Sequence, residues 1–167
     1  MDFPRTSVLR WDLAKLTEAM QITESEVKEY FTDGRRVSFV LERRISREIV
    51  GGKLSSSEGA AYDLLDSKGG KWEVRSLTRG GIYFCPSYMV GSGRKFDEPG
   101  FLRKIDEIEG YIVSDVELFP DVPVWVISKE DVLNWWSNGE LGSGTKISRA
   151  KAHQLFSRFA EQSQSEQ

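Results

Sequence analysis

Apolar residues in the first fifty positions recur at intervals of three and four, the period of an amphipathic helix. This spacing predicts one helix over about residues 6–21. The run Thr23-Glu24-Ser25-Glu26 is a capping box that predicts a second helix, which Asp33-Gly34 ends. A third helix is expected from about 35 to 50, closed by Gly51-Gly52. The apolar stripe of the first predicted helix consists of Leu9, Leu13, Leu16 and Met20.

The pattern changes to short runs beyond residue 54. Ser55 to Glu58 has the form of a capping box, which predicts a short helix over about 55–61. Two strand-like runs follow, at 62–66 and 71–78, and the turn Ser67-Lys68-Gly69-Gly70 between them predicts a hairpin. A third strand is expected over 82–89.

Helical and strand-like runs alternate in the last third of the chain. The order of the whole chain predicts an α/β (α+β) domain with a mixed sheet. Residues 1–53 form a helical N-terminal subdomain in this reading, 54–161 the α/β core and 162–167 a flexible tail. The expected elements after residue 98 are a helix over 99–109, strands over 111–116 and 122–128, a helix capped by Ser128 that holds Trp135 and Trp136, a strand over 145–147 and a helix from Ser148 to about Glu161.

Composition narrows the chemistry that this domain can perform. The chain has 167 residues, which suits one domain, and its net charge of −3 excludes a simple polycation that coats nucleic acid. A single cysteine and a single histidine exclude an intramolecular disulfide and a Cys/His zinc site. Apolar runs are too short for a membrane span and the N-terminus has no signal-peptide pattern, so we expect a cytoplasmic protein without a membrane partner.

Two carboxylates are expected to converge on the predicted hairpin. Glu73 and Arg75 share one face of a strand because side chains alternate, and the four-residue turn brings Asp63 into their neighbourhood. Two carboxylates with a backbone carbonyl form a hard oxygen site that suits Mg²⁺. Asp66 is an alternative first ligand, although its place beside Ser-Lys-Gly-Gly is typical of a residue that stabilises a turn.

The run Asp63…Glu73-Val74-Arg75 resembles the D…(D/E)-x-K signature of the PD-(D/E)XK nuclease superfamily, and small type II restriction endonucleases look most similar. The resemblance implies an αβββαβ core with Glu58 on the preceding helix. It further implies a homodimeric, Mg²⁺-dependent endonuclease that cuts double-stranded DNA at specific sites, with Mn²⁺ as a possible substitute metal. The catalytic residues would be Glu58, Asp63, Glu73 and Arg75, and the metal ligands Asp63, Glu73 and the Val74 carbonyl.

The chain departs from this signature at Arg75, which stands where the family has lysine. Arginine stays charged and cannot deprotonate water, but it can hold the scissile phosphate. Three explanations remain open: the metal generates hydroxide without a basic side chain, Lys71 or Lys68 takes the place of the family lysine, or the site is inactive.

Basic residues cluster in two segments. Residues 35–53 hold six basic against two acidic side chains and resemble a helix-turn-helix, which suits DNA phosphates or a dimer contact equally. Residues 143–158 hold four basic residues and no acid, whereas 97–121 hold eight acids and two bases and should face away from DNA. A non-catalytic DNA-binding regulatory or accessory protein is therefore the alternative function. The predicted DNA contacts are Arg35, Arg36, Arg43, Arg79, Arg94, Lys95, Lys146 and Arg149.

Overall fold

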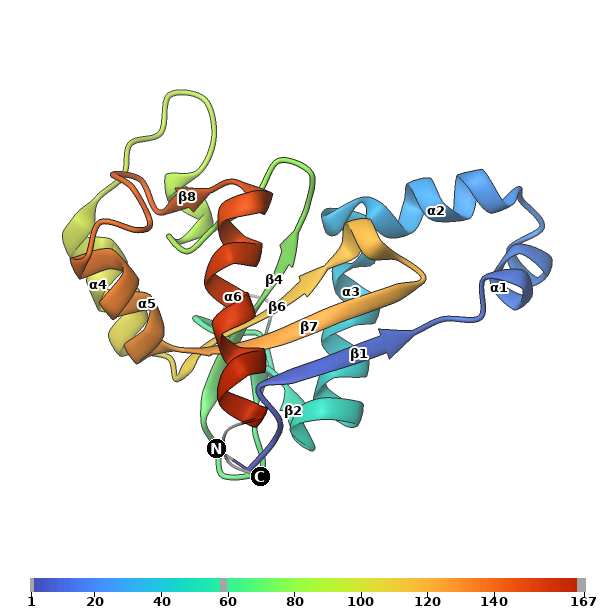
Figure 1. Cartoon of the computed structure of the whole chain (residues 1–167), viewed down its shortest axis with the longest axis horizontal. Helices are drawn as coiled ribbons and strands as arrows, with labels where there is room; N and C mark the ends of the chain where they lie inside the picture. Colours follow the sequence, from blue (N-terminus) through green and yellow to red (C-terminus); the bar gives the residue numbers. More distant parts are fainter. Residues whose placement is uncertain (1, 58–59, 165–167) are drawn as a thin grey trace.

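The computed structural model describes residues 2–57 and 60–164, and it has a six-stranded mixed sheet with helices on both faces (Figure 1). The strands β4 and β6 are parallel, and every other neighbouring pair in this sheet is antiparallel. A separate two-stranded sheet joins β5 (Ile82–Tyr83) to β8 (Lys146–Ile147). The strands of the large sheet, in their order across it, are β1 (Thr6–Arg10), β7 (Asp121–Ser128), β6 (Gly110–Asp115), β4 (Lys71–Leu77), β3 (Leu64–Leu65) and β2 (Lys53–Leu54).

Each face of the sheet has its own hydrophobic core. The helices α2 (Glu24–Thr32) and α3 (Gly34–Ile45) cover one face, and α3 continues as a π-helical turn over Ser46–Val50. Figure 1 shows α3 behind the sheet and α6 in front of it. The opposite face is covered by α4 (Glu98–Asp106), α5 (Lys129–Ser137) and α6 (Arg149–Gln164).

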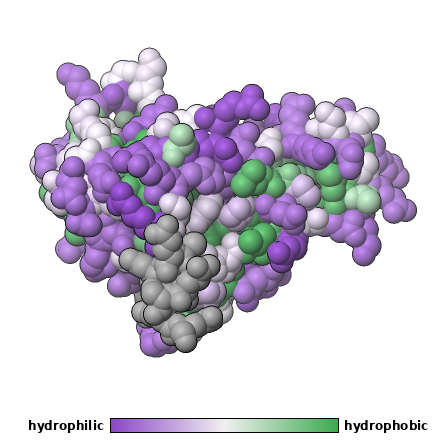
Figure 2. Space-filling view, viewed as in Figure 1, coloured by the Kyte–Doolittle hydropathy of each residue, from purple (hydrophilic) through white to green (hydrophobic). Residues whose placement is uncertain are grey.

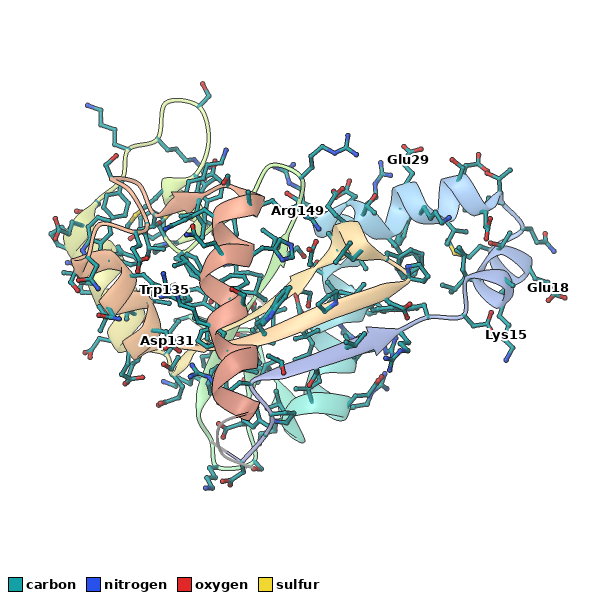
Figure 3. All side chains as sticks on the ribbon, viewed as in Figure 1. Lys15, Glu18, Glu29, Asp131, Trp135 and Arg149 are labelled. Carbon is teal, nitrogen blue, oxygen red and sulfur yellow. The ribbon has the colours of Figure 1, made fainter. Side chains whose placement is uncertain are left out.

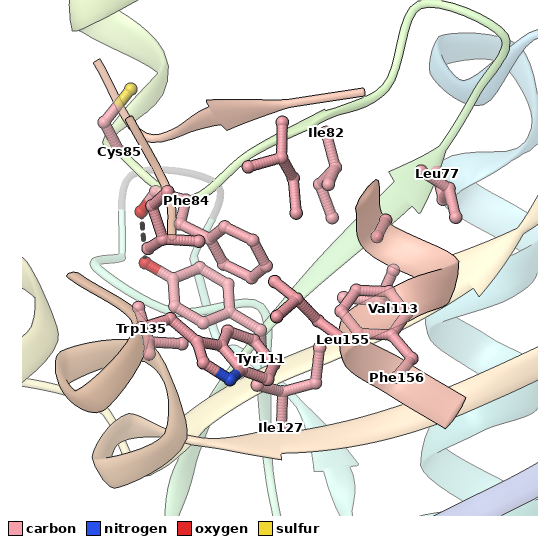
Figure 4. Packing of buried hydrophobic residues seen from close by; sticks show 14 of the residues in the cluster. Leu77, Ile82, Phe84, Cys85, Tyr111, Val113, Ile127, Trp135, Leu155 and Phe156 are labelled. Carbon is pink, nitrogen blue, oxygen red and sulfur yellow. Dashed lines mark hydrogen bonds between the residues drawn. The ribbon is translucent and has the colours of Figure 1, made fainter. Parts of the chain in front are cut away.

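The middle strand β6 serves both cores, since all six of its residues are buried. Tyr111 and Val113 pack against the α4–α6 side, whereas Ile112 packs against the α2–α3 side. The hydroxyl of Tyr111 donates a hydrogen bond of 2.5 Å to the Phe84 carbonyl inside the core (Figure 4). Burial raises the pKa of Tyr111, because the charged phenolate would be poorly solvated there.

The helix predicted over 6–21 is wrong in its first half. Thr6–Arg10 form the edge strand β1, in which Leu9 is buried and pairs with Val122, and the helix α1 covers Leu13–Met20. Asp12 separates the two elements, because its side chain accepts a hydrogen bond from the Lys15 amide and caps α1. The predicted stripe from Leu9 to Met20 is therefore not one surface, and the first 53 residues contribute a strand to the common sheet.

Other predictions divide between confirmed and corrected elements. The predicted Thr23–Glu26 capping box is present, the predicted Ser128 cap forms a capping box with Asp131, and β3 and β4 form the expected hairpin. The helix predicted over 55–61 is wrong for the residues described there, because the Ser55 hydroxyl bonds to the backbone of Ser57 in a local turn. The helix that precedes the three strands is α3 instead.

Two further boundaries differ from the prediction. The strand expected over 82–89 ends at Tyr83 and pairs with β8 rather than with the large sheet, because Pro86 and a 3₁₀ turn at Ser87–Met89 follow. At the other end, α6 continues to Gln164, beyond the predicted end of the helix. No helix within residues 2–57 and 60–164 is both long and apolar enough to cross a membrane.

Candidate active site

Asp63 and Glu73 meet at an exposed edge of β4. The strand β3 pairs with β4 only at Lys71 and Trp72, so the rest of β4 lacks a strand partner on this side among the described residues. A carboxylate oxygen of Asp63 accepts a hydrogen bond of 2.7 Å from the Val74 amide, in the place where a neighbouring strand would bond. The N–H and C=O of a strand residue point the same way, so the Val74 carbonyl faces this edge too.

The carboxylate of Glu73 forms ion pairs with two basic side chains. Its Oε1 lies 2.8 Å from an Arg75 nitrogen on the same strand, and its Oε2 lies 2.6 Å from the Nζ of Lys104 on α4. The side chains of Glu73 and Lys104 are each only 13% exposed, and Lys104 also donates to the Ala61 carbonyl. Arg75 has a further bond to the Cys85 carbonyl, while its Nε is buried and has no hydrogen-bond partner in the described structure.

A third carboxylate approaches from the other side of the site. Glu42 lies on α3, and burial together with the charges of Asp63 and Glu73 raises its pKa. The pKa of Asp63 is raised as well, first by burial and then by the charge of Glu73, while the Val74 amide partly opposes the change. Three mutually repelling carboxylates therefore interact around the edge of β4.

The donor set fits a hard divalent cation of the magnesium type. No three acidic, histidine or cysteine side chains in the described parts of the chain lie close enough to form a metal site by themselves. Mg²⁺ usually binds through one or two carboxylates and keeps several waters and substrate oxygens as its other ligands. The site offers two carboxylates, Asp63 and Glu73, together with the Val74 carbonyl, which is enough for Mg²⁺ binding of this kind. The two carboxylates repel each other, and a bound cation would relieve that repulsion.

The structure places the alternative residues away from this cluster. Asp66 accepts hydrogen bonds from the amides of Lys68 and Gly70 and from the Trp72 indole, so it stabilises the hairpin turn. Burial alone would raise the pKa of Asp66, but these bonds outweigh it and hold the pKa below its usual value. The amine of Lys68 pairs with Asp2, and Lys71 lies over the Tyr62 ring. Glu58 lies outside the described residues.

A groove of about 1110 Å³ extends from the β4 edge between α2–α3 on one wall and β5, β8 and the segment 87–94 on the other. Its lining includes Arg75 and two acidic residues, Glu29 and Asp33. Glu29 points outward from α2 in Figure 3. Among the described residues, the lining has five basic side chains and only these two acidic ones, so its net charge is positive. Four of the predicted DNA contacts belong to it, namely Arg35, Arg36, Arg94 and Lys146.

The remaining predicted DNA contacts are not among the residues that line this groove. The guanidinium of Arg43 lies over the Phe39 ring on α3, and Arg79 pairs loosely with Glu117. Lys95 is exposed in the segment before α4.

Arg149, at the start of α6 (Figure 3), is engaged by a buried acid. Its guanidinium lies 2.6 Å from Oδ2 of Asp115, which is fully buried, and the same oxygen lies 2.7 Å from Nε2 of His153. This cluster joins α6 to the end of β6. In the view of Figure 2 the surface around the N-terminal end of α6 is mostly polar, while hydrophobic residues are exposed between this end of α6 and α1.

Sequence reasoning missed Lys104 and Glu42. The sequence alternatives for the basic residue, Lys71 and Lys68, lie near Glu73 along the chain, whereas Lys104 lies on the helix that connects β4 to β6. Glu42 belongs to α3, whereas the sequence predicts the helix before the strands at 55–61. No local signal in the sequence distinguishes Glu42 from Glu48, the other acid of the third predicted helix.

Comparisons of the chain with protein-family models, with curated proteins and with solved structures found no significant match. The arrangement at the edge of β4 is thus the main observation that bears on function.

Proposed function

We propose that this protein is a Mg²⁺-dependent endonuclease of the restriction type that hydrolyses phosphodiester bonds in DNA. The observation that carries the proposal is the cluster of charged side chains at the β4 edge. In it, the Lys104 amine lies 2.6 Å from the Glu73 carboxylate, and Asp63 accepts a hydrogen bond from the Val74 amide. The cluster adjoins a groove whose lining is basic and includes Arg75. A metal-dependent nuclease requires acidic side chains that bind the metal ion and basic side chains that bind the phosphates of DNA.

The order of elements supports the same proposal. From α3 onward, the strands of the large sheet and the helices that cover it follow the order α3, β2, β3, β4, α4 and β6, while the short β5 between β4 and α4 belongs to the two-stranded sheet. This order agrees with the αβββαβ core that the nuclease resemblance implies, with α3 in place of the helix expected at 55–61. Asp63 precedes the second of these strands and Glu73 lies on the third, so both candidate ligands come from the hairpin.

Charge balance indicates what each side chain would do. Asp63, Glu73 and the Val74 carbonyl would hold Mg²⁺, and the bound ion would supply activation of water and stabilisation of the charge that develops on the phosphoryl group. Arg75 lines the groove and would hold a phosphate oxygen there. Lys104 neutralises Glu73 and can donate hydrogen bonds to the attacking water or to a phosphate oxygen.

The three carboxylates Asp63, Glu73 and Glu42 interact with three basic side chains, Arg75, Lys104 and Arg43, so the formal charge of the cluster is zero. A bound divalent cation would make the cluster positive, which would attract a phosphodiester. The basic groove supplies further contacts to neighbouring phosphates. Cleavage of both strands requires two such sites, which a homodimer with two-fold symmetry supplies.

One observation favours the alternative of a non-catalytic DNA-binding protein. Both carboxylate oxygens of Glu73 are engaged by cations, so a metal must displace or share at least one of these ion pairs. In that alternative the groove still binds DNA, and the cluster serves only to hold α4 on β4.

Incubation of the purified protein with supercoiled plasmid and with linear duplexes tests the proposal. We expect cleavage with Mg²⁺ or Mn²⁺, none with EDTA, and none from Glu73→Gln, which keeps the shape of the side chain and removes its charge. Glu107→Gln, an exposed position at the end of α4, is the matched control and should cleave normally. DNA binding without cleavage under every metal condition supports the non-catalytic alternative and overturns the nuclease.

A further inference from the structure

Phe39 is the most exposed large hydrophobic side chain in the described structure, with 61% of its surface accessible. It lies on α3, in which Val37, Leu41 and Ile45 are almost completely buried and Val40 is partly buried. The helix thus buries its regular apolar face and presents an additional aromatic ring to solvent. A phenylalanine contributes much more stabilisation when its ring is covered, so this exposed ring is suited to contact a ligand.

Arg43 holds the ring in a defined arrangement. Its guanidinium carbon lies 3.3 Å from the centre of the Phe39 ring, and its NH1 donates a hydrogen bond of 3.0 Å to the Phe39 carbonyl. The two residues are four apart on one helix, so their side chains are neighbours on its surface. Aromatic rings and arginine planes are the two kinds of surface on which proteins stack nucleobases.

The pair lies one helical turn from the candidate active site. Glu42, which interacts with Asp63 and Glu73, is three residues from Phe39 and adjacent to Arg43 in the chain. Residues three apart on a helix are surface neighbours. On the other side of Phe39, Arg35 and Ser38 line the basic groove. A base on Phe39 would therefore belong to a nucleotide close to the phosphate that Glu73 and Arg75 receive.

A second exposed aromatic residue, Tyr88, is adjacent in the chain to Ser87, which lines the opposite wall of the groove, and it is 60% accessible. Tyr88 and Phe39 do not line the groove themselves, but each is next to a residue that does. Exposed rings beside a basic groove are typical of sites that hold a strand through its phosphates and its bases. The charge of the lining favours a polyanion over an apolar segment of another protein.

We propose that Phe39 and Arg43 form a stacking surface for an unpaired nucleobase beside the scissile phosphate, an inference that rests on the proposed nuclease function for the identity of the strand. Bases inside an intact duplex are stacked on one another and offer no free face. Within the DNA that the protein cleaves, we therefore expect a preference for positions where a nucleotide beside the scissile phosphate is unpaired, such as the junction of a forked duplex.

Binding in EDTA tests this inference without requiring cleavage. Fluorescence anisotropy compares a single strand, a forked duplex and a blunt duplex of equal length, and 2-aminopurine at the fork reports stacking. We expect tighter binding of the fork and the single strand than of the blunt duplex. Phe39→Ala should lower the affinity for the fork about tenfold and leave that for the blunt duplex unchanged, because stacking involves one base. Phe39→Trp should restore both the affinity and the 2-aminopurine signal.

Leu133→Ala, which shortens an exposed apolar side chain on α5, is the matched control and should bind as the unaltered protein does. Equal affinities of Phe39→Ala and the unaltered protein for the fork overturn the inference, as does an equal loss for all three DNAs. A shift of Phe39→Ala from dimer to monomer in light scattering overturns it in favour of a contact between two copies. If the protein does not cleave DNA but Phe39→Ala still weakens binding of the fork, only the proposed nuclease function is overturned. If the protein cleaves DNA but Phe39→Ala binds the fork normally, only the proposed stacking surface is overturned.

Discussion

The Nζ of Lys104 lies 2.6 Å from Oε2 of Glu73, although 31 residues separate them in the chain. The contact follows from topology. The strands β4 and β6 are parallel, so the chain must cross one face of the sheet between them, and α4 is that crossover. Glu73 points to the face on which α4 packs, so the helix can place an amine beside it. The crossover helix thus supplies the cation that the Glu-Val-Arg sequence of β4 does not contain.

Lys104→Met should lower the rate of metal-dependent cleavage by about 10²–10³-fold, because it removes a hydrogen-bond donor next to the charge that develops on phosphate. Single-turnover assays on a saturating DNA concentration measure this loss. Lys104→Arg keeps the ion pair with Glu73 and should recover part of the rate. Lys71→Met, on the same face of β4 but directed at Tyr62, is the control. An unchanged rate for Lys104→Met contradicts the assigned role.

Local signals predicted most of the elements, because capping boxes and turn residues act through near neighbours in the chain. The Thr23 and Ser128 caps and the Ser67–Gly70 turn are examples. Leu9 illustrates the limit, since its spacing from Leu13 is compatible with one helix and equally with a strand followed by a capped helix. Which alternative forms depends on pairing with β7, more than a hundred residues away.

The candidate site divides in the same way. Asp63 and Glu73 belong to one hairpin, so their approach could be expected from the turn length and the alternation of the strand. Lys104 and Glu42 come from helices on either side of the sheet, and the sequence contains no local signal for which helical turn reaches the edge of β4. Tertiary packing of α3 and α4 decides those contacts.

Asp63→Asn should stabilise the protein at neutral pH. The pKa of Asp63 is raised in the folded state, mainly by burial and then by the charge of Glu73. The folded state therefore binds this proton more tightly than the unfolded chain does, and stability falls as the pH rises from the usual aspartate pKa of 3.8 through the raised pKa of the folded state. Asparagine removes that loss and can still accept the Val74 hydrogen bond. Calorimetry should show a higher Tm than that of the unaltered protein at pH 7 and no advantage below about pH 3.

Asp66→Asn provides the opposite control. Its pKa is lowered by hydrogen bonds from the turn, so its charge contributes stability above the unfolded pKa that is lost as the pH falls through the folded pKa. The substitution should lower Tm at pH 7 and have less effect in acid. A lower Tm for Asp63→Asn at pH 7 contradicts the repulsion between the two carboxylates.

Mg²⁺ should raise the Tm of the protein in the absence of DNA. A ligand that binds the folded state at ten times its Kd stabilises it by about 1.4 kcal/mol. Differential scanning fluorimetry over a Mg²⁺ series, with K⁺ at matched ionic strength, measures the change. Glu73→Gln should abolish it, because one of the two carboxylate ligands loses its charge. An equal increase with Mg²⁺ in both proteins indicates that the ion binds elsewhere.

Gly34→Ala should destabilise the fold despite the higher helix propensity of alanine. A Cβ at Gly34 would lie 2.8 Å from Cβ of Ser76 and 3.2 Å from a Thr78 methyl, so α3 would have to move away from the edge of β4. Overpacking of this kind costs about 1–3 kcal/mol. Urea denaturation measures it, and Gly144→Ala is the matched control, since nothing lies within 4 Å of a Cβ there. Equal midpoints for the two variants contradict the close approach of α3 to β4.

Asp115→Ala should cost about 1–3 kcal/mol of unfolding free energy, because it removes the buried acceptor that joins Arg149 and His153 of α6 to β6. Urea denaturation with a constant m-value measures the loss. Asp121→Ala removes the exposed partner of Arg10, at 3.7 Å, and should change the free energy by no more than about 1 kcal/mol. Arg149→Gln separates the two roles considered for this arginine. A fall in stability with unchanged DNA affinity assigns Arg149 to the attachment of α6, whereas a fall in DNA affinity with unchanged stability assigns it to DNA.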